Sequence, residues 1–103
     1  MVDSGNLYIW KQQIRELQDA YSMAMDHGEF GYFNDIFMED IQANYGIAGT
    51  GSGLESLKSI CREALEPLDA VQHVNGNHWA RIDTQSADAG CYFRVHMTRK
   101  DAV

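Results

Sequence analysis

Residues 90–99 read GCYFRVHMTR, and the alternation of their side chains indicates the fold class. A period of two is typical of a half-buried β-strand, because successive side chains point to opposite faces of a sheet. Residues 70–82 predict a long strand before it with a bend or bulge at Gly76, and the polar run 83–89 predicts the turn between them. The two expected faces of the last strand are Cys91, Phe93, Val95 and Met97 on one side, and Tyr92, Arg94, His96 and Thr98 on the other.

A long helix is expected at the N-terminus. Asp3 or Ser4 can cap it, and His27-Gly28 should close it, because glycine readily takes the left-handed conformation of a helix end. Apolar residues recur there at steps of three and four, which predicts one buried stripe: Trp10, Ile14, Leu17, Tyr21, Ala24 and Met25.

The middle of the chain predicts three further elements. Residues 30–37 predict a short second helix, and the alternating residues 40–45 predict a strand that begins at Asp40. The four glycines within 46–53 indicate a loop. Ser52 and Glu55 have the spacing of a capping box that opens a third helix, which Pro67 would end.

The order helix, helix, strand, helix, strand, strand predicts an α+β fold, with helices packed on one face of an antiparallel sheet. The length of 103 residues fits a single domain spanning 1–103. No apolar run approaches the roughly 18 residues of a membrane span, and residues 1–6 do not have the pattern of a secretion signal.

Charge and cysteine content narrow the class of partner. A net charge of −7, with eight Lys and Arg in no basic cluster, argues against nucleic acid. Cys61 and Cys91 have no metal-ligand spacing, which indicates free thiols in a reducing cytoplasm. The glycine loop lacks the Lys-Ser/Thr ending of a phosphate cradle, and His73 and His78 make no zinc pattern.

Candidate chemistry concentrates on the end of the first helix and the first long strand. Tyr21 and Asp26 lie five residues apart on that helix, and His73 lies on the strand. A carboxylate at a helix C-terminus opposes the helix dipole, which favours a functional role for Asp26. Two structural alternatives stay open: Tyr21 as a core tyrosine, and His73 as a hydrogen-bonded structural histidine. Asp40 is interpreted as a strand-start residue.

Three runs together resemble a known family. They are YSMAMDHGEF at 21–30, IFMEDI at 36–41 and HVN at 73–75, with Gly53 and Leu54 opening a helix. This ordered set, over about residues 7–99, is similar to the SnoaL-like division of the nuclear transport factor 2 superfamily, which includes scytalone dehydratase and polyketide cyclases. The resemblance implies a cystatin-like α+β cone, in which three N-terminal helices pack on a strongly curved antiparallel sheet around a pocket.

The resemblance also implies roles for individual residues. In the lyase members a strand histidine removes a proton from carbon, an aspartate near the end of the first helix holds that histidine, and a tyrosine one turn earlier polarises the substrate. By position these roles fall on His73, Asp26 and Tyr21, with no metal or organic cofactor. Residues expected to bind the substrate are Asn75, Tyr45, Phe93 and Met97.

The resulting hypothesis is a cofactor-independent lyase or isomerase, dehydratase- or cyclase-like, for a small apolar organic substrate. The alternative is a non-catalytic small-ligand-binding or dimerisation module of the same fold. An epoxide hydrolase or cyclase would instead need an Asp-Arg-Asp cluster, with Arg81 or Arg94 pointing inward. His96 lies near the place of a second pocket histidine of scytalone dehydratase, but the alternation puts it on the face opposite Phe93.

This sequence differs from the family pattern at the C-terminus. Family chains usually continue past the position of Arg99 with further strands, so the domain is expected to be C-terminally short. A last strand with an unpaired edge invites association, and a homodimer or higher oligomer is therefore expected.

Overall fold

The computed structural model describes residues 4–101 and confirms an α+β fold with three helices. Asp3, one of the two expected caps of the first helix, lies outside these residues. The elements in chain order are α1 (Ser4–His27), the 3-10 helix η1 (Phe30–Tyr32), α2 (Phe33–Ile36), β1 (Gln42–Asn44), the 3-10 helix η2 (Gly46–Ala48), β2 (Thr50–Ser52), α3 (Leu54–Leu65), β3 (Leu68–Ile82) and β4 (Ala87–Arg99).

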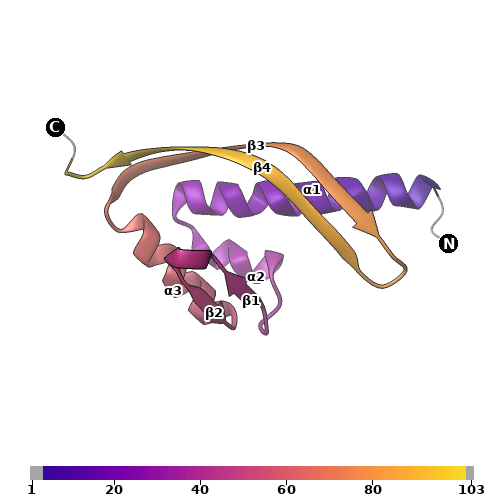
Figure 1. The fold of residues 1–103 in the computed structure, drawn as a ribbon, viewed down its shortest axis with the longest axis horizontal. Helices are drawn as coiled ribbons and strands as arrows, with labels where there is room; N and C mark the ends of the chain where they lie inside the picture. Colours follow the sequence, from indigo (N-terminus) through magenta and orange to yellow (C-terminus); the bar gives the residue numbers. More distant parts are fainter. Residues whose placement is uncertain (1–3, 102–103) are drawn as a thin grey trace.

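Strands β3 and β4 form a long antiparallel ribbon that lies along α1, while α2, α3 and the short strands form a lobe below the C-terminal half of α1 in the view of Figure 1. The register shifts between Gly76 and Trp79, which confirms the bulge expected at Gly76. Asn77 takes a φ of 51° within it. The bulge exchanges the faces of the strand, so that His78 rather than Asn77 turns toward α1.

The sheet differs from the expectation in its pairing. Within residues 4–101, β1 pairs with β2 and not with the ribbon, which gives two separate two-stranded sheets. Strand β2 lies inside the segment 46–53 that the glycines marked as a loop. A Cβ on Gly51 would come within 2.6 Å of Ser56 Oγ, so the glycine is there because α3 packs directly against the strand.

Two local expectations are wrong. Ser52 belongs to β2, and the N-cap of α3 is Gly53, with a φ of 93° and no side-chain cap, so residues 52–55 are not a capping box. The turn of the ribbon is also shorter than 83–89, because β4 already begins at Ala87.

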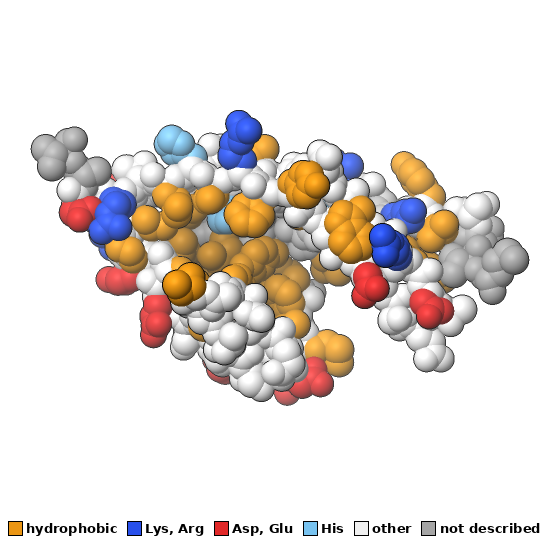
Figure 2. Space-filling view, viewed as in Figure 1, with side chains coloured by type: hydrophobic (Ala, Val, Ile, Leu, Met, Phe, Trp, Pro, Cys, Tyr) orange, Lys and Arg blue, Asp and Glu red, His pale blue; other side chains and the backbone are white. Residues whose placement is uncertain are grey.

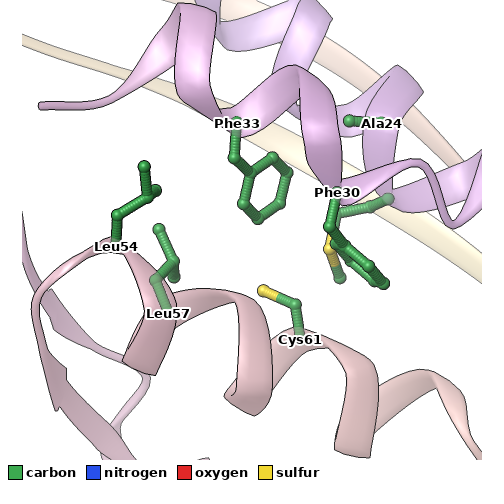
Figure 3. Packing of buried hydrophobic residues seen from close by; sticks show 7 residues of the cluster. Ala24, Phe30, Phe33, Leu54, Leu57 and Cys61 are labelled. Carbon is green, nitrogen blue, oxygen red and sulfur yellow. The ribbon is translucent and has the colours of Figure 1, made fainter. Parts of the chain in front are cut away.

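The hydrophobic core lies where the C-terminal half of α1 meets α2 and α3. Figure 3 shows that its side chains point toward one another across these helices, with Phe33 fully buried at the centre. The N-terminal half of the apolar stripe on α1 is not part of it, because Trp10 and Leu17 remain 37% and 44% exposed. The core residues are Ala24, Met25, Phe30, Phe33, Leu54, Leu57 and Cys61.

Candidate active site

A cavity of about 730 Å³ lies between α1, α3 and the inner face of the ribbon. Figure 2 shows hydrophobic side chains gathered in the hollow between the ribbon and the lobe that contains α3. Six of the seven residues predicted for the site line this cavity: Tyr21, Tyr45, His73, Asn75, Phe93 and Met97. The seventh, Asp26, is bonded to His73 in its wall.

Asp26 and His73 are brought together by the last turns of α1 and the middle of β3. The Nδ1 atom of His73 lies 2.6 Å from Asp26 Oδ1, and the backbone N–H of His73 donates to both carboxylate oxygens at 3.0 Å. Both side chains are largely buried, at 13% and 16% exposure. These donors offset the unfavourable position of a carboxylate at a helix C-terminus.

The same contact determines which nitrogen of His73 carries hydrogen. An ionised carboxylate can only accept hydrogen bonds, so Nδ1 of His73 must donate to Asp26. In the neutral ring Nε2 then carries a lone pair, at the tip of a side chain that lines the cavity. An imidazole held in this way has the arrangement of a general base with its orienting acid.

Tyr21 and Tyr45 form a pair of phenols in the cavity wall. Their hydroxyl oxygens are 2.6 Å apart, and the Tyr45 hydroxyl is also 3.8 Å from Cys61 Sγ. Burial raises the pKa of Tyr21 to about 12, and burial followed by the hydrogen bond with Tyr21 raises the pKa of Tyr45 further. Both phenols therefore stay protonated near neutral pH. If one O–H bonds the other tyrosine, the second remains available to a ligand.

The two alternatives for Tyr21 are compatible in the structure. Its ring stacks on Phe33 and meets Phe37 edge-on, with centroids 5.5 and 5.8 Å apart. Its hydroxyl faces the cavity and Tyr45. One side chain thus joins the core and the wall of the site.

A polar network beside the cavity holds Asn75. Its side-chain nitrogen lies 2.9 Å from Ser22 Oγ and 3.0 Å from Asp19 Oδ1, and its side-chain oxygen accepts from Ser22 at 3.2 Å. Asp19 also accepts from His78 Nε2 at 2.9 Å. Asn75 therefore lines the cavity with an amide that is already bonded to α1.

The sequence did not predict a place for Ser22, Asp19 or His78 in the site. Positions 19, 22 and 26 follow the three- and four-residue steps of one helix face, and this polar row was the available signal. Burial raises the pKa of Asp19, but the hydrogen bonds from Asn75 and His78, with the charges of His78 and Arg15, bring it below the ordinary value.

The cavity is open along β4. Phe93 and Met97 line it yet remain 63% and 55% exposed, and Phe93 lies 5.8 Å from the His73 ring. Neither Arg81 nor Arg94 lines the cavity, and Arg81 instead stacks over Trp79. The Asp-Arg-Asp cluster of an epoxide hydrolase or cyclase is therefore not formed by these arginines.

Three further properties concern binding and environment. Within residues 4–101, no group of three or more His, Cys, Asp or Glu side chains could hold a metal ion. No helix in this described range has the length and apolar character needed to cross a membrane. Cys61 and Cys91 are free thiols, and burial raises the pKa of both.

Comparisons with known proteins agree with this architecture. A family described as a SnoaL-like domain matches residues 10–102. The structure superposes on the crystal structure of a proposed scytalone dehydratase from Novosphingobium aromaticivorans with a TM-score of 0.87 and 14% sequence identity. The match covers 98% of this chain and 68% of that chain, and at this identity it establishes the fold alone. No protein of curated function matches the sequence.

Proposed function

The chain belongs to the SnoaL-like domain family, and from the geometry of its cavity we propose that it is a cofactor-independent lyase or isomerase, dehydratase- or cyclase-like. The observation that carries the proposal is the 2.6 Å contact between His73 Nδ1 and Asp26 in the wall of a cavity of about 730 Å³. It leaves Nε2 as the basic nitrogen for a bound molecule.

The proposed reaction begins with removal of a proton from a carbon next to a carbonyl group. His73 Nε2 takes the proton, and the Asp26 carboxylate stabilises the imidazolium that forms. The electron pair of the broken C–H bond moves into the enolate, whose oxygen accepts a hydrogen bond from Tyr21 or Tyr45.

Two outcomes follow from that intermediate. In an isomerase the imidazolium returns the proton to another carbon of the enolate. In a lyase the enolate expels a hydroxyl group from the adjacent carbon, and the imidazolium protonates it, so that water leaves and a double bond forms. Both leave His73 neutral again, and neither requires an oxidant or a cofactor.

The wall chemistry favours an uncharged, largely apolar substrate. Within the described residues no Lys or Arg lines the cavity, and the acidic Glu63 does, so a carboxylate or phosphate on the substrate would lack a counter-charge. The apolar walls come from α1, α3 and β4, with Met25, Ile60 and Phe93 among them. Polyketides, terpenoids and steroid-like compounds have this character.

The alternative, a ligand-binding or dimerisation module, draws on the exposed apolar residues of β4, since a second copy of the chain could cover Phe93 and Met97. We propose a homodimer or higher oligomer on this ground. The two free thiols support a cytoplasmic location.

Exchange of the α-hydrogens of β-tetralone in deuterium oxide, followed by proton NMR, tests the first step without requiring the natural substrate. The wild-type protein should accelerate exchange over buffer, and His73→Ala should lower the rate by about 10³-fold. His96→Ala is the matched control, because His96 is exposed on the neighbouring strand outside the cavity. Exchange no faster than buffer, or unaffected by His73→Ala, would contradict the mechanism.

A further inference from the structure

One polar atom in the cavity wall is unexplained by the proposed mechanism. The side-chain oxygen of Gln18, Oε1, is buried and has no hydrogen-bond partner among the described residues. Gln18 lies on α1 between the cavity of His73 and the smaller hollow beside His78, and it lines both. A buried polar group without a partner is destabilising, so it calls for a physical reason.

The position of Gln18 places it at the end of the cavity remote from the base. Gln18, Tyr21, Ser22 and Met25 form the row of α1 that lines the cavity. With a rise of about 1.5 Å per residue, Gln18 lies roughly 12 Å from Asp26 along the helix axis and roughly 4–5 Å from Tyr21. A ligand that contacts both His73 and Gln18 must therefore extend along α1, away from Asp26.

Three polar side chains near Gln18 are already bonded to one another or to β3. Ser22 and Asn75 bond each other, and Asp19 accepts from Asn75 and His78. Among the polar side chains that α1 and β3 contribute to this end, the Gln18 carboxamide is thus the one with no side-chain hydrogen bond to give up within the described residues, while Glu63 and Cys91 line the cavity from α3 and β4.

We propose that Gln18 is a specificity-determining residue that binds a hydroxyl group at the end of the ligand remote from the reactive carbon. A hydroxyl fits because it can donate to the amide oxygen and can equally accept from the amide nitrogen. A fused-ring skeleton with the reactive ketone near His73 and the hydroxyl near Gln18 has the required shape. The assignment of the reactive end rests on the proposed function, whereas the hydroxyl contact rests on Gln18.

Direct binding tests this contact separately from catalysis. The probes are β-tetralone and the β-tetralones that carry one hydroxyl on the aromatic ring, with dissociation constants measured by isothermal titration calorimetry. The wild-type protein should bind the best-placed hydroxylated probe about 10-fold more tightly than β-tetralone. In Gln18→Met this preference should fall to about 2-fold or less, because the thioether is a poor acceptor.

The controls separate a local effect from a folding defect. Gln13→Met makes the same change on an exposed position of α1 and should keep the wild-type preference. Gln18→Met gives up no observed hydrogen bond of Oε1, so it should unfold at or above the wild-type temperature, and Gln18→Leu provides a second apolar replacement.

Three results would overturn the inference: no hydroxylated probe favoured by the wild type, a preference that survives both Gln18 variants, or no probe bound at millimolar concentration. A preference that depends on Gln18, together with no catalysed α-hydrogen exchange, would support the contact and reject the proposed reaction.

Discussion

Two histidine–aspartate pairs join α1 to β3, and they use their imidazole rings in opposite ways. His73 bonds Asp26 through Nδ1 at 2.6 Å, so its distal nitrogen Nε2 is left for the cavity. His78 bonds Asp19 through Nε2 at 2.9 Å, so its distal nitrogen is already engaged. The same two residue types therefore form the proposed base in one place and a link between helix and strand in the other.

The two pairs also differ in their exposure, their hydrogen bonds and the space beside them. Asp26 is 16% exposed, and its hydrogen bonds to His73 involve both the ring and the backbone N–H. Asp19 is 47% exposed, and its carboxylate also holds Asn75. His73 faces a cavity of about 730 Å³, whereas His78 lines a smaller hollow of about 240 Å³. The ring nitrogen used and the space beside it, rather than residue identity, distinguish the two roles.

The largest expected difference between the pairs is in catalysis. Asp26→Asn should lower β-tetralone exchange by about 10³-fold, because an amide can donate to Nδ1 and favour the tautomer with hydrogen on Nε2. Asp19→Asn is the matched change in the other pair and should leave the rate within about 3-fold. Exchange rates from proton NMR decide the comparison, and equal losses would mean that both pairs act as one unit.

A smaller loss is expected when the phenol near the first pair is removed. Tyr21→Phe keeps the ring that packs on Phe33 and removes the hydroxyl, so exchange should fall by about 10²-fold while the protein stays folded. Tyr32→Phe, on a side chain that is 57% exposed, is the control. An unchanged rate in Tyr21→Phe would leave Tyr45 as the oxygen-binding phenol, which Tyr45→Phe would then reveal.

The pair of His78 and Asp19 should contribute to the stability of the fold rather than to catalysis. His78→Ala removes a side chain that is only 9% exposed and its bond to Asp19, which should lower the free energy of unfolding by about 1–3 kcal/mol. Urea unfolding followed by circular dichroism measures this value. The exchange rate per folded molecule should stay within a few-fold of wild type, and a loss as large as that of His73→Ala would contradict the assignment.

The smallest expected effect is a pH dependence specific to Asp19. Its native pKa is below the ordinary value of 3.8, so its ionised form stabilises the folded state above that pH. The contribution is lost as the pH falls through the lower native pKa. Asp19→Asn should therefore narrow the difference in unfolding free energy between about pH 5 and about pH 2.5. An identical difference in wild type and variant would show that Asp19 does not contribute to it.

Sequence periodicity predicted the elements that have a regular pattern. The steps of three and four in α1 and the alternation in β4 identify a helix and a strand directly, and Gly76 marked the bulge in β3. Strand β2 was not predicted, because its residues, Thr50 to Ser52, centre on a glycine and show no apolar alternation. Its pairing depends on the approach of α3, which local sequence does not encode.

The contacts of the candidate site were likewise predicted only in part. The roles of Asp26, His73 and Tyr21 were predicted through the family resemblance, and the fold brings the first two into contact. The contact of His78 with Asp19 was not predicted, because the bulge at 76–79 reverses which side chains of β3 face α1. Regular alternation would place Asn77 there.

By itself the sequence determined the helices, the long strands and the acidic charge, because these follow from residue types and their spacing along the chain. Only the tertiary structure decided that β1 pairs with β2, that His73 presents Nε2 while His78 does not, and that Gln18 is left without a partner. Those outcomes depend on the register of the bulge and the docking of α1 and α3, which bring together residues far apart in sequence.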